Sequence, residues 1–313
     1  MSARPPRVWI DCDPGHDDAF ALLLAARTCE VVGISTVSGN VALASTTRNA
    51  AIVRDLAGLS APLHRGAAGP LVGTPRHAPD VHGHSGLDGP VLPEPVGRVE
   101  VLPAASAIVH AAHDADDLWL VATGPLTNLA LALHLDPTLV ERIAGISLMG
   151  GSRSFGNTSA AAEFNILADP EAADVVFRCG ARIVMAGLDL THQFRLGRDE
   201  VDQLAEIDGP VGRFASELLG FFLHAYERRS GRPSAPMHDP CAVLALTDPE
   251  LFEREALSVT VELRGEHTRG MTLCDQRETE RRAAPNVEVL TSIDAPAAWA
   301  RLHGALAAYG AAA

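Results

Sequence analysis

Short apolar runs alternate along this chain with longer segments of helical periodicity, and this alternation limits the possible folds more than any other feature. Strands are predicted at residues 8–10, 31–37, 118–122, 143–149 and 183–188. Helices are predicted between them at residues 17–27, 46–56, 104–112, 126–135 and 170–177. Such alternation indicates βαβ units and a mainly parallel sheet with helices on both faces. We therefore expect an α/β, doubly wound fold in a single domain spanning residues 1–313.

Two regions of the chain lack this periodicity. Residues 66–95 are rich in Gly, Pro and His and predict a long surface loop of the kind that is often functional. A second irregular region, residues 228–240, follows a helix predicted at residues 211–229. The C-terminal part is predicted to form a β-hairpin, a further strand and a last helix, at residues 258–263, 270–273, 287–290 and 295–308.

The charge of the chain excludes several classes of function. The formal net charge is −14, which would repel phosphate backbones and anionic headgroups, so nucleic acids and membrane surfaces are poor partners. The chain has 25 basic residues and no lysine, so all of them are arginine. Schiff-base chemistry and a P-loop both need a lysine and are therefore excluded. A small neutral molecule or a cation fits better.

The chain also lacks the features of a secreted or membrane protein. No apolar run has the length that crosses a bilayer, and the N-terminal residues lack the apolar core of a signal peptide. The five cysteines are odd in number, widely spaced and without a CxxC pair, which predicts reduced packing residues rather than disulfides or a zinc site. A cytoplasmic protein is expected.

Four aspartates follow the first predicted strand within eight residues: Asp11, Asp13, Asp17 and Asp18. Acids in a first helical turn complement the helix dipole by about 0.3–1 kcal/mol each, which would account for Asp17 or Asp18 but not for all four. Two carboxylates 4 Å apart repel by about 1 kcal/mol in water and by more where solvent is excluded, and a bound cation would remove that cost. Oxygen ligands without His or Cys favour Ca²⁺ or Mg²⁺ over Zn²⁺.

An EF-hand does not explain this cluster. That loop needs Gly at its sixth position and Glu at its twelfth, where this chain has His16 and Leu22. Further ligands must come from other parts of the chain. In doubly wound sheets these parts are the carboxyl ends of other strands.

Polar residues do follow the other predicted strands. They form the segments 38–40, 123–128 and 149–151, and two more polar segments, 163–165 and 238–240, precede later helices. Each has an ordinary explanation when taken alone: turn chemistry for the Gly and Asn residues, and a helix N-cap for Asp239 with Pro240 behind it. A lone histidine such as His238 is more often structural than catalytic. Together, however, they could furnish one site at the edge of the sheet.

Taken in order, these segments resemble the inosine-uridine nucleoside hydrolase family, whose characteristic motif is an aspartate-rich DxDPGxDD turn near the N-terminus. That turn is present here as residues 11–18. The resemblance spans nearly the whole chain and continues through residues 39–40, 82–87, 123–128, 149–151, 163–165 and 238–240. It implies a calcium-dependent hydrolase that cleaves the N-glycosidic bond of ribonucleosides to ribose and free base.

The resemblance also implies a role for each residue. One Ca²⁺ per subunit would be held by Asp13, Asp18, Asp239 and the carbonyl of Thr123, and Asp13 would also be the general base. The ribose diol would be bound by Asp17, Asn40, Asn165 and Asp239. The 5′ side of the sugar would be lined by Met149, Asn157 and Glu163, with Phe164 completing the substrate-binding set. Asp11 would support the turn from behind.

The departing base needs an acid or a stacking partner. His238 is the best candidate for the acid and His82 is the second, while Tyr226 either lies against the base or packs within its helix. The sequence leaves the base preference open between broad inosine-uridine use and pyrimidine preference, because residues 226–236 match the family least well. The family resemblance also implies a homodimer or homotetramer.

Two other classes remain as alternatives. A haloacid-dehalogenase-like phosphatase also begins with a strand and a DxD pair, which Asp11 and Asp13 could imitate, but that family usually uses a lysine that this chain lacks. A noncatalytic calcium-binding or sugar-binding protein would be expected to have lost one of the polar segments, and all of them are intact.

Overall fold

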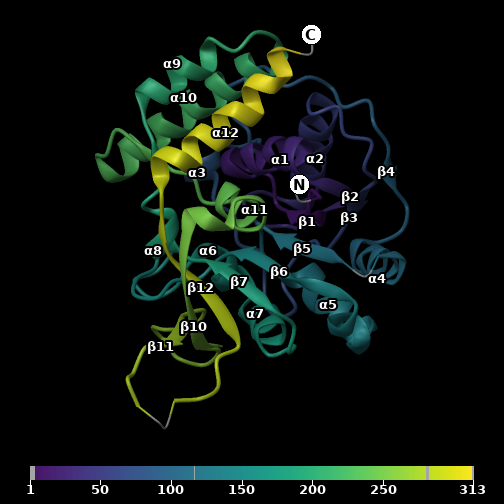
Figure 1. The fold of residues 1–313 in the computed structure, drawn as a ribbon, viewed down its shortest axis with the longest axis vertical. Coiled ribbons are helices and arrows are strands. Elements are labelled where there is room, and N and C mark those ends of the chain that lie inside the picture. The colour runs from purple at the N-terminus through teal and green to yellow at the C-terminus, as the bar shows by residue number, and fades with distance from the viewer. Residues whose placement is uncertain (1–3, 116, 280–281, 312–313) are drawn as a thin grey trace.

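A computed structural model describes residues 4–115, 117–279 and 282–311 and has one large twisted sheet at its centre (Figure 1). The strand order is β11-β10-β12-β7-β6-β5-β1-β2-β3-β4. Among the described strands of this sheet, β10 runs antiparallel to both of its neighbours and the other pairs are parallel. The strands are β1 (Arg7–Cys12), β2 (Glu30–Thr36), β3 (Leu63–Arg65), β4 (Val99–Glu100), β5 (Leu118–Ala122), β6 (Ile143–Met149), β7 (Ile183–Ala186), β10 (Phe252–Val261), β11 (Thr272–Asp275) and β12 (Val287–Ile293).

Helices cover both faces of this sheet, which confirms the predicted doubly wound α/β class. The α-helices are α1 (His16–Thr28), α2 (Leu43–Leu56), α3 (Pro79–His82), α4 (Ala104–Asp114), α5 (Thr127–Leu135), α6 (Phe164–Ala168), α7 (Pro170–Phe177), α8 (Leu188–Thr191), α9 (Arg198–Ala205), α10 (Pro210–Ser230), α11 (Pro240–Thr247) and α12 (Ala295–Gly310). Two 3-10 helices, η1 (Pro137–Glu141) and η2 (Pro249–Leu251), and a small sheet of β8 (Arg195–Leu196) and β9 (Ala235–Pro236) complete the described elements.

The central strand β1 shows why two layers of helices are needed. Successive side chains of a strand point to opposite faces of the sheet. Val8, Ile10 and Cys12 pack into the core that α1, α10, α11 and α12 build, whereas Trp9 packs into the core of α4, α5 and α7. Figure 1 shows these two groups of helices on opposite sides of the strands. Each face of the sheet therefore has its own apolar core.

Several predicted boundaries agree with the structure and others were wrong. β5, β6 and α7 have the predicted bounds. The strand predicted at residues 183–188 ends at Ala186, because Gly187 then starts the short helix α8, whose first residue donates its backbone N–H to the carbonyl of Gly151 (2.9 Å). The short strands β3, β4, β8 and β9 and the helix α9 were not predicted.

The two segments predicted to be irregular are more structured than expected. Residues 66–95 are mostly irregular and lie mostly at the surface, which confirms the predicted long surface loop, but they contain the short helix α3, and His82 and Leu87 are buried. In the second segment, α10 continues to Ser230 and β9 precedes α11. Both segments approach the carboxyl ends of the strands, which is where the structure places the candidate site.

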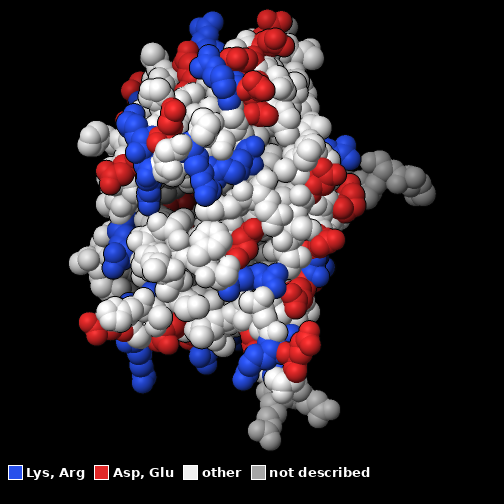
Figure 2. Space-filling model, turned by 90° about the vertical axis from the view of Figure 1, so that its left-hand side faces the viewer, with Lys and Arg blue, Asp and Glu red and all other residues white. Residues whose placement is uncertain are grey.

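The surface and the helices bear on possible partners. In the view of Figure 2, arginine and acidic side chains are interspersed over one face, with uncharged surface between them. Among the described residues, no helix is both long and apolar enough to cross a membrane.

Candidate active site

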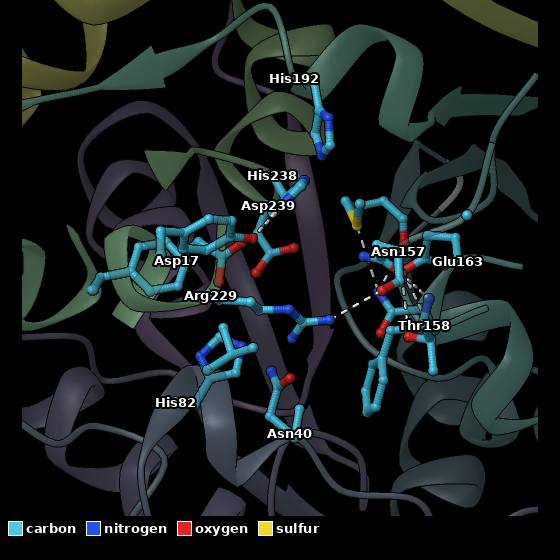
Figure 3. Close-up of a pocket in the computed structure, with 18 of the residues that line it drawn as sticks. Asp17, Asn40, His82, Asn157, Thr158, Glu163, His192, Arg229, His238 and Asp239 are labelled. Carbon is cyan, nitrogen blue, oxygen red and sulfur yellow. Dashed lines mark hydrogen bonds between the residues drawn. The ribbon is translucent and has the colours of Figure 1, made fainter. Parts of the chain in front are cut away.

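A cavity of about 570 Å³ opens at the carboxyl ends of β1, β2, β5 and β6, the position expected for a ligand site in a doubly wound sheet. Twelve of the predicted site residues line it, and Figure 3 shows several of them facing one another across the space. They are Asp17, Asn40, His82, Thr123, Met149, Asn157, Glu163, Phe164, Asn165, Tyr226, His238 and Asp239. Segments far apart in the sequence therefore converge on one cavity.

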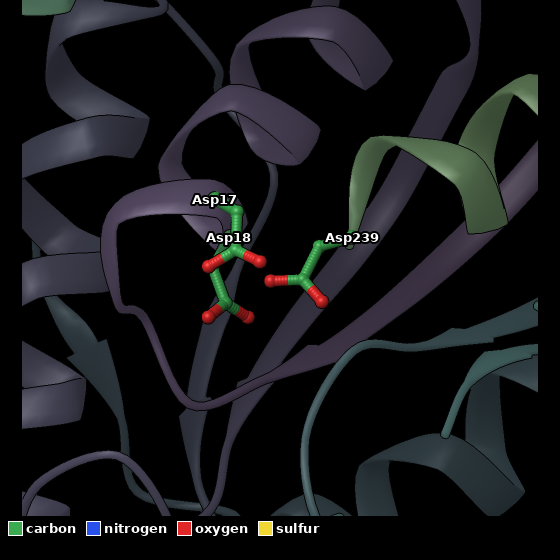
Figure 4. A group of neighbouring side chains, drawn as sticks. All are labelled: Asp17, Asp18 and Asp239. Carbon is green, nitrogen blue, oxygen red and sulfur yellow. The ribbon is translucent and has the colours of Figure 1, made fainter. Parts of the chain in front are cut away.

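The floor of the cavity is acidic: Asp17 and Asp239 line it, whereas Asp13 and Asp18 are not among the described lining residues. Asp17 and Asp18 lie in the first turn of α1, and Asp239 precedes α11. Carboxylate oxygens of these three residues lie within 4.8 Å of one another, and all three side chains are buried (Figure 4). Asp239 stands at the N-cap position of α11, but within the described chain its side chain makes no capping hydrogen bond. The ordinary N-cap explanation therefore does not account for this carboxylate.

Asp13 and Asp18 are held by hydrogen bonds from neighbouring strand ends. Oδ2 of Asp13 accepts from the backbone N–H of Asn40 (2.6 Å). Asp18 accepts from the backbone N–H of Gly15 at Oδ2 (2.9 Å) and from Oγ1 of Thr123 at Oδ1 (2.7 Å). Oδ1 of Asp13 is buried and has no hydrogen-bond partner among the described residues. An added Cβ at Gly124 would press against this carboxylate, so the chain approaches it closely.

Burial and mutual repulsion make these aspartates costly to ionise. Desolvation raises the pKa of Asp17 to about 7, with a further contribution from Asp18. The pKa values of Asp13 and Asp239 lie well above the usual range, first because of desolvation and then because of the neighbouring carboxylates. The pKa of Asp18 is raised by desolvation and lowered in part by its hydrogen bonds. A bound cation would reverse these shifts.

The donor set fits a hard divalent cation. All the ligand atoms are oxygens, and one carboxylate oxygen, Oδ1 of Asp13, is buried without a partner among the described residues. The placement differs in detail from what the resemblance implies. The close group contains Asp17, whereas Asp13 lies outside it, and the carbonyl of Thr123 accepts a hydrogen bond from Nδ2 of Asn165 (2.8 Å).

Asp11 lies behind this group and contacts no part of the cavity among the described residues. Its Oδ1 accepts from Oγ of Ser35 (2.5 Å) and from Nδ2 of Asn128 (2.7 Å). The Ser35 hydroxyl accepts in turn from Nε1 of Trp9 (2.8 Å). Asp11 thus ties β1 to β2 and to α5 beneath the cluster.

The side of the cavity formed by β6 and α6 is polar and well ordered by backbone hydrogen bonds. Nδ2 of Asn165 donates to the carbonyls of Thr123 and of Met149 (2.8 and 3.0 Å). Glu163 caps α6 by accepting from the N–H of Asn165 (2.8 Å) and from the next residue, and it also accepts from Gly151. Asn157 Oδ1 accepts from the backbone N–H of Phe164 (3.0 Å). Glu163 and Asn157 are thus held in place before any ligand binds.

Two histidines and a tyrosine form the opposite wall. His238 lies with Nδ1 2.7 Å from Oγ1 of Thr191 and Nε2 3.3 Å from the hydroxyl of Tyr226. Desolvation, with His192 and Arg195, lowers the pKa of His238 to about 3, so its ring is neutral at physiological pH. Burial also lowers the pKa of His82 well below its usual value. Each ring can offer one N–H to a ligand in this state.

Several residues of the cavity were not predicted from the sequence, among them Val81, Phe155, Thr158, His192, Phe222 and Arg229. Phe222 was detectable in principle, because it lies one helical turn before Tyr226. Arg229 reaches across the cavity to donate to the carbonyl of Asn157 (3.0 Å), as Figure 3 shows. Only the tertiary fold brings α10 and the β6–α6 connection together, so the sequence carried no signal for that contact.

Comparison with known proteins identifies the family. The model of the family "Inosine-uridine preferring nucleoside hydrolase" matches residues 8–300. The chain belongs to this nucleoside hydrolase family. Its similarity to curated members covers most of both sequences: it is 42% identical over 294 residues to the pyrimidine-specific ribonucleoside hydrolase RihA of Enterobacter sp. (strain 638), covering 92% of this chain and 93% of the relative. It is 43% identical over 280 residues to RihA of Photobacterium profundum, covering 88% and 89%.

Solved structures agree with this assignment. The purine-preferring ribonucleoside hydrolase from Gardnerella vaginalis matches with a TM-score of 0.92 and 30% identity, covering 98% of this chain and 100% of that one. The plant nucleoside hydrolase PpNRh1 matches with a TM-score of 0.90 and 31% identity, covering 97% and 99%. This nucleoside hydrolase is therefore an enzyme that acts on the N-glycosidic bond of ribonucleosides, and the phosphatase and noncatalytic alternatives no longer apply.

Proposed function

We propose that this nucleoside hydrolase cleaves pyrimidine ribonucleosides to ribose and free base with the help of one bound Ca²⁺ per subunit. The observation that carries the proposal is the group of buried carboxylates of Asp17, Asp18 and Asp239, with the unpartnered Oδ1 of Asp13 beside them, at the floor of a cavity large enough for a nucleoside. Four acids with raised pKa values at one place suit a divalent cation and a cationic transition state.

The relatives support pyrimidine preference over broad inosine-uridine use. The curated relatives that match at 42% and 43% identity are named as pyrimidine-specific. The structural relatives named for purine preference or for inosine and guanosine match at only 30–31%. Two neutral histidines, His82 and His238, line the cavity beside Tyr226 and can offer hydrogen-bond donors to a base with carbonyl groups.

We assign the metal site to Asp13, Asp18, Asp239 and the carbonyl of Thr123, as the resemblance implies, and add Asp17 because its carboxylate lies in the close group. When bound, a divalent cation orients a water molecule and lowers its pKa. Asp13 is proposed as the general base. Its Oδ2 is fixed by the N–H of Asn40, and its Oδ1 is left without a partner among the described residues and so can take a proton.

The remaining polar residues are proposed to bind the ribose. Asp17, Asn40, Asn165 and Asp239 would hold the diol, while Met149, Asn157, Glu163 and Phe164 would line the 5′ side. Breaking the N-glycosidic bond builds positive charge at the anomeric carbon, and the surrounding carboxylates and carboxamides stabilise that charge. Because Glu163 and Asn157 are already fixed by backbone N–H groups, the ribose would meet a preorganised surface.

His238 is proposed as the group that assists departure of the base, with His82 as the second candidate. The ring of His238 is fixed between Thr191 and Tyr226. It is neutral in the ligand-free protein, so it offers its N–H as a hydrogen-bond donor to the base. This hydrogen bond stabilises the negative charge that develops on the leaving group, whereas full proton transfer to the base requires the imidazolium form, because a neutral ring would be left as imidazolate.

The compartment and the assembly remain proposals. All five cysteines are free thiols, which supports a reducing compartment such as the cytoplasm. The expected homodimer or homotetramer rests on the family resemblance alone, and light scattering of the purified protein would decide between them.

The test of the function is a reducing-sugar assay with uridine, cytidine, inosine and adenosine, and with uridine 5′-monophosphate as a control. Release of ribose from uridine and cytidine at a kcat/KM at least about tenfold above that for the purine nucleosides supports pyrimidine preference. Equal rates on inosine would favour the broad alternative. Dependence on Ca²⁺ is tested in the same assay by chelation with EGTA followed by re-addition of Ca²⁺.

A further inference from the structure

His16 is the first residue of α1, directly before Asp17 and Asp18, yet it is not among the described residues that line the cavity. Its side chain is 0% exposed. Burying an imidazole there is costly unless its polar atoms have partners. The partners of this ring show what the residue does.

Both the backbone and the ring of His16 contact His82. The backbone N–H of His16 donates to Nδ1 of His82 (3.1 Å), and Nδ1 of His16 lies 3.2 Å from the same nitrogen. A backbone N–H can only donate, so Nδ1 of His82 presents its lone pair to His16. The hydrogen of a neutral His82 ring is therefore on Nε2, which has no hydrogen-bond partner among the described residues and belongs to a side chain that lines the cavity.

The other ring nitrogen of His16 holds the far end of the same loop. Nε2 of His16 donates to the backbone carbonyl of Asp88 (2.9 Å). Nδ1 of a neutral His16 ring then carries a lone pair and cannot donate to His82. His82 is therefore oriented by the backbone N–H of His16, whereas the His16 ring holds Asp88. The side chain of Asp88 closes the segment from within, because it accepts from the N–H of His84 and from both the N–H and the hydroxyl of Ser85. His16 thus contacts residues 82 and 88, the two ends of a tight turn.

Aromatic stacking fixes the plane of the His16 ring. It lies parallel to Phe222 and to Phe221 of α10, with ring centroids 5.1 and 5.3 Å apart and interplanar angles of 5°. His82 also stacks on Phe222, with centroids 5.6 Å apart. His16 therefore joins three parts of the fold: the aspartate turn, the loop that carries His82, and α10.

We propose that His16 is a positioning residue that clamps the turn between residues 82 and 88, so that His82 directs Nε2–H into the nucleobase side of the cavity. The proposal rests on the proposed function, because it assigns the orientation of a residue in that same site. It deepens that function in one respect. A fixed N–H donor suits the 2-carbonyl group that uracil and cytosine share next to the glycosidic nitrogen, and purines have no carbonyl at that place.

The test is a double-mutant cycle between His16 and His82, measured as kcat/KM for uridine on the Ca²⁺-loaded enzyme. His16→Phe keeps the stacking on Phe221 and Phe222 and removes both ring nitrogens. It should lower kcat/KM about tenfold, the effect of losing about one buried hydrogen bond at the site. His82→Ala should lower it by at least as much, and the double variant should lose no more than His82→Ala alone.

His64→Phe is the matched control. His64 is also buried, packs against an aromatic ring (Trp9), and lies with Nδ1 2.8 Å from a backbone carbonyl, but it is remote from the cavity. Its replacement should leave kcat/KM for uridine unchanged. The Ca²⁺ affinity of His16→Phe should stay within about twofold of the wild type, which excludes an effect through the neighbouring aspartates.

Three outcomes would overturn the proposal: full activity of His16→Phe, losses that multiply in the double variant, or His82→Ala with unchanged turnover. The last would also remove His82 from the proposed function. If the wild type does not cleave uridine at all, pyrimidine hydrolysis fails, but the contact can still be tested. ¹⁵N chemical shifts of the wild-type histidine rings should then show both His16 and His82 protonated at Nε2 and bare at Nδ1, and the reverse pattern for either ring would refute the clamp. The same spectrum decides the case where His16→Phe does not fold.

Discussion

Four buried aspartates, namely Asp13, Asp17, Asp18 and Asp239, form the floor of the candidate site, with Asp11 behind them, whereas His82, Tyr226 and His238 form its wall on the proposed base side. Burial raises the pKa values of the floor, so in the ligand-free protein its charge is costly. Burial lowers the pKa values of the wall histidines, so that they are neutral. The same desolvation thus makes binding of a cation favourable for the floor carboxylates and keeps the wall histidines as neutral N–H donors.

The two regions also differ in how they are held. The floor residues lie at strand ends and helix starts and are fixed by hydrogen bonds within a few residues or from adjacent strands, such as Asn40 to Asp13 and Gly15 to Asp18. The wall residues come from α3, α10 and the segment before α11. Tyr226 and His238 contact each other, His238 also contacts Thr191 of α8, and His82 accepts from the backbone N–H of His16. Substitutions in the floor should therefore abolish hydrolysis. Substitutions in the wall should lower the rate of hydrolysis and change how that rate depends on the leaving group.

The largest effect is expected for Asp13→Ala. It removes the proposed base and one metal ligand, and kcat for uridine should fall at least about 10³-fold. Initial rates of ribose release measure it. Asp169→Asn is the matched control, because Asp169 is equally buried but caps α7 and contacts Leu71 and Thr127 instead of the cavity. The control should lose thermal stability and keep kcat, and an Asp13 variant that retained more than about a tenth of the wild-type rate would contradict the assignment.

Most of the floor could be predicted from the sequence, because it is built locally. An apolar strand running into Asp11 to Asp18 places those acids at a sheet edge regardless of the details of packing. Asp239 needed the family resemblance, since the N-cap explanation was equally good until the structure showed its side chain making no cap within the described chain. The core strands β5 and β6 were found for the same local reason, their continuous apolar runs.

The residues of the wall could be predicted from the sequence, but their arrangement in space could not. His82 stands on a helix of four residues inside a Gly- and Pro-rich stretch, where no periodicity marks the fold. Its contact with His16 spans 66 positions, and the contact of Tyr226 with His238 depends on how α10 packs beside α11. The strands β3 and β4 were missed because two or three residues are too few to show alternation.

Removal of Ca²⁺ should have an effect on turnover as large as that of Asp13→Ala, and its effect on stability should depend on pH. Chelation should abolish turnover reversibly, and Ca²⁺ should raise the melting temperature more at about pH 8 than at about pH 5. A carboxyl group whose folded-state pKa is raised, such as Asp17 from 3.8 to about 7, holds its proton better in the folded state. Stability of the metal-free protein therefore falls as pH rises through that window, and bound Ca²⁺ relieves this loss by displacing the protons.

The wall histidines act in the opposite direction. The pKa of His238 falls from 6.5 to about 3, so this group favours folding more as pH rises through that window. The contribution of His238 to stability is present with and without metal. The difference between the melting temperatures with EGTA and with Ca²⁺ therefore reports on the carboxylates alone. Scanning calorimetry at several pH values with EGTA or Ca²⁺ measures that difference. A stabilisation by Ca²⁺ that is constant with pH would mean that the floor carboxylates are already ionised in the metal-free protein.

His238→Ala should have an intermediate effect, lowering kcat for uridine about 10²-fold. The loss should be much smaller with p-nitrophenyl riboside, whose leaving group departs without a proton. Comparing the two substrates separates assistance to the leaving group from damage to the metal or ribose sites, which would slow both equally. Equal losses on both substrates would show that His238 does not assist the leaving group.

The smallest effect is expected for Tyr226→Phe. The change removes only the hydroxyl, which lies 3.3 Å from Nε2 of His238, and keeps the edge-to-face contact with Phe222. If the hydroxyl orients the imidazole, kcat for uridine should fall about two- to tenfold, in line with one hydrogen bond, and the loss should vanish in a His238→Ala background. Tyr226→Leu is the companion variant, because it also removes the ring. A Phe variant with full activity beside an impaired Leu variant would assign Tyr226 to packing, and a loss that persists without His238 would place its hydroxyl on the substrate itself.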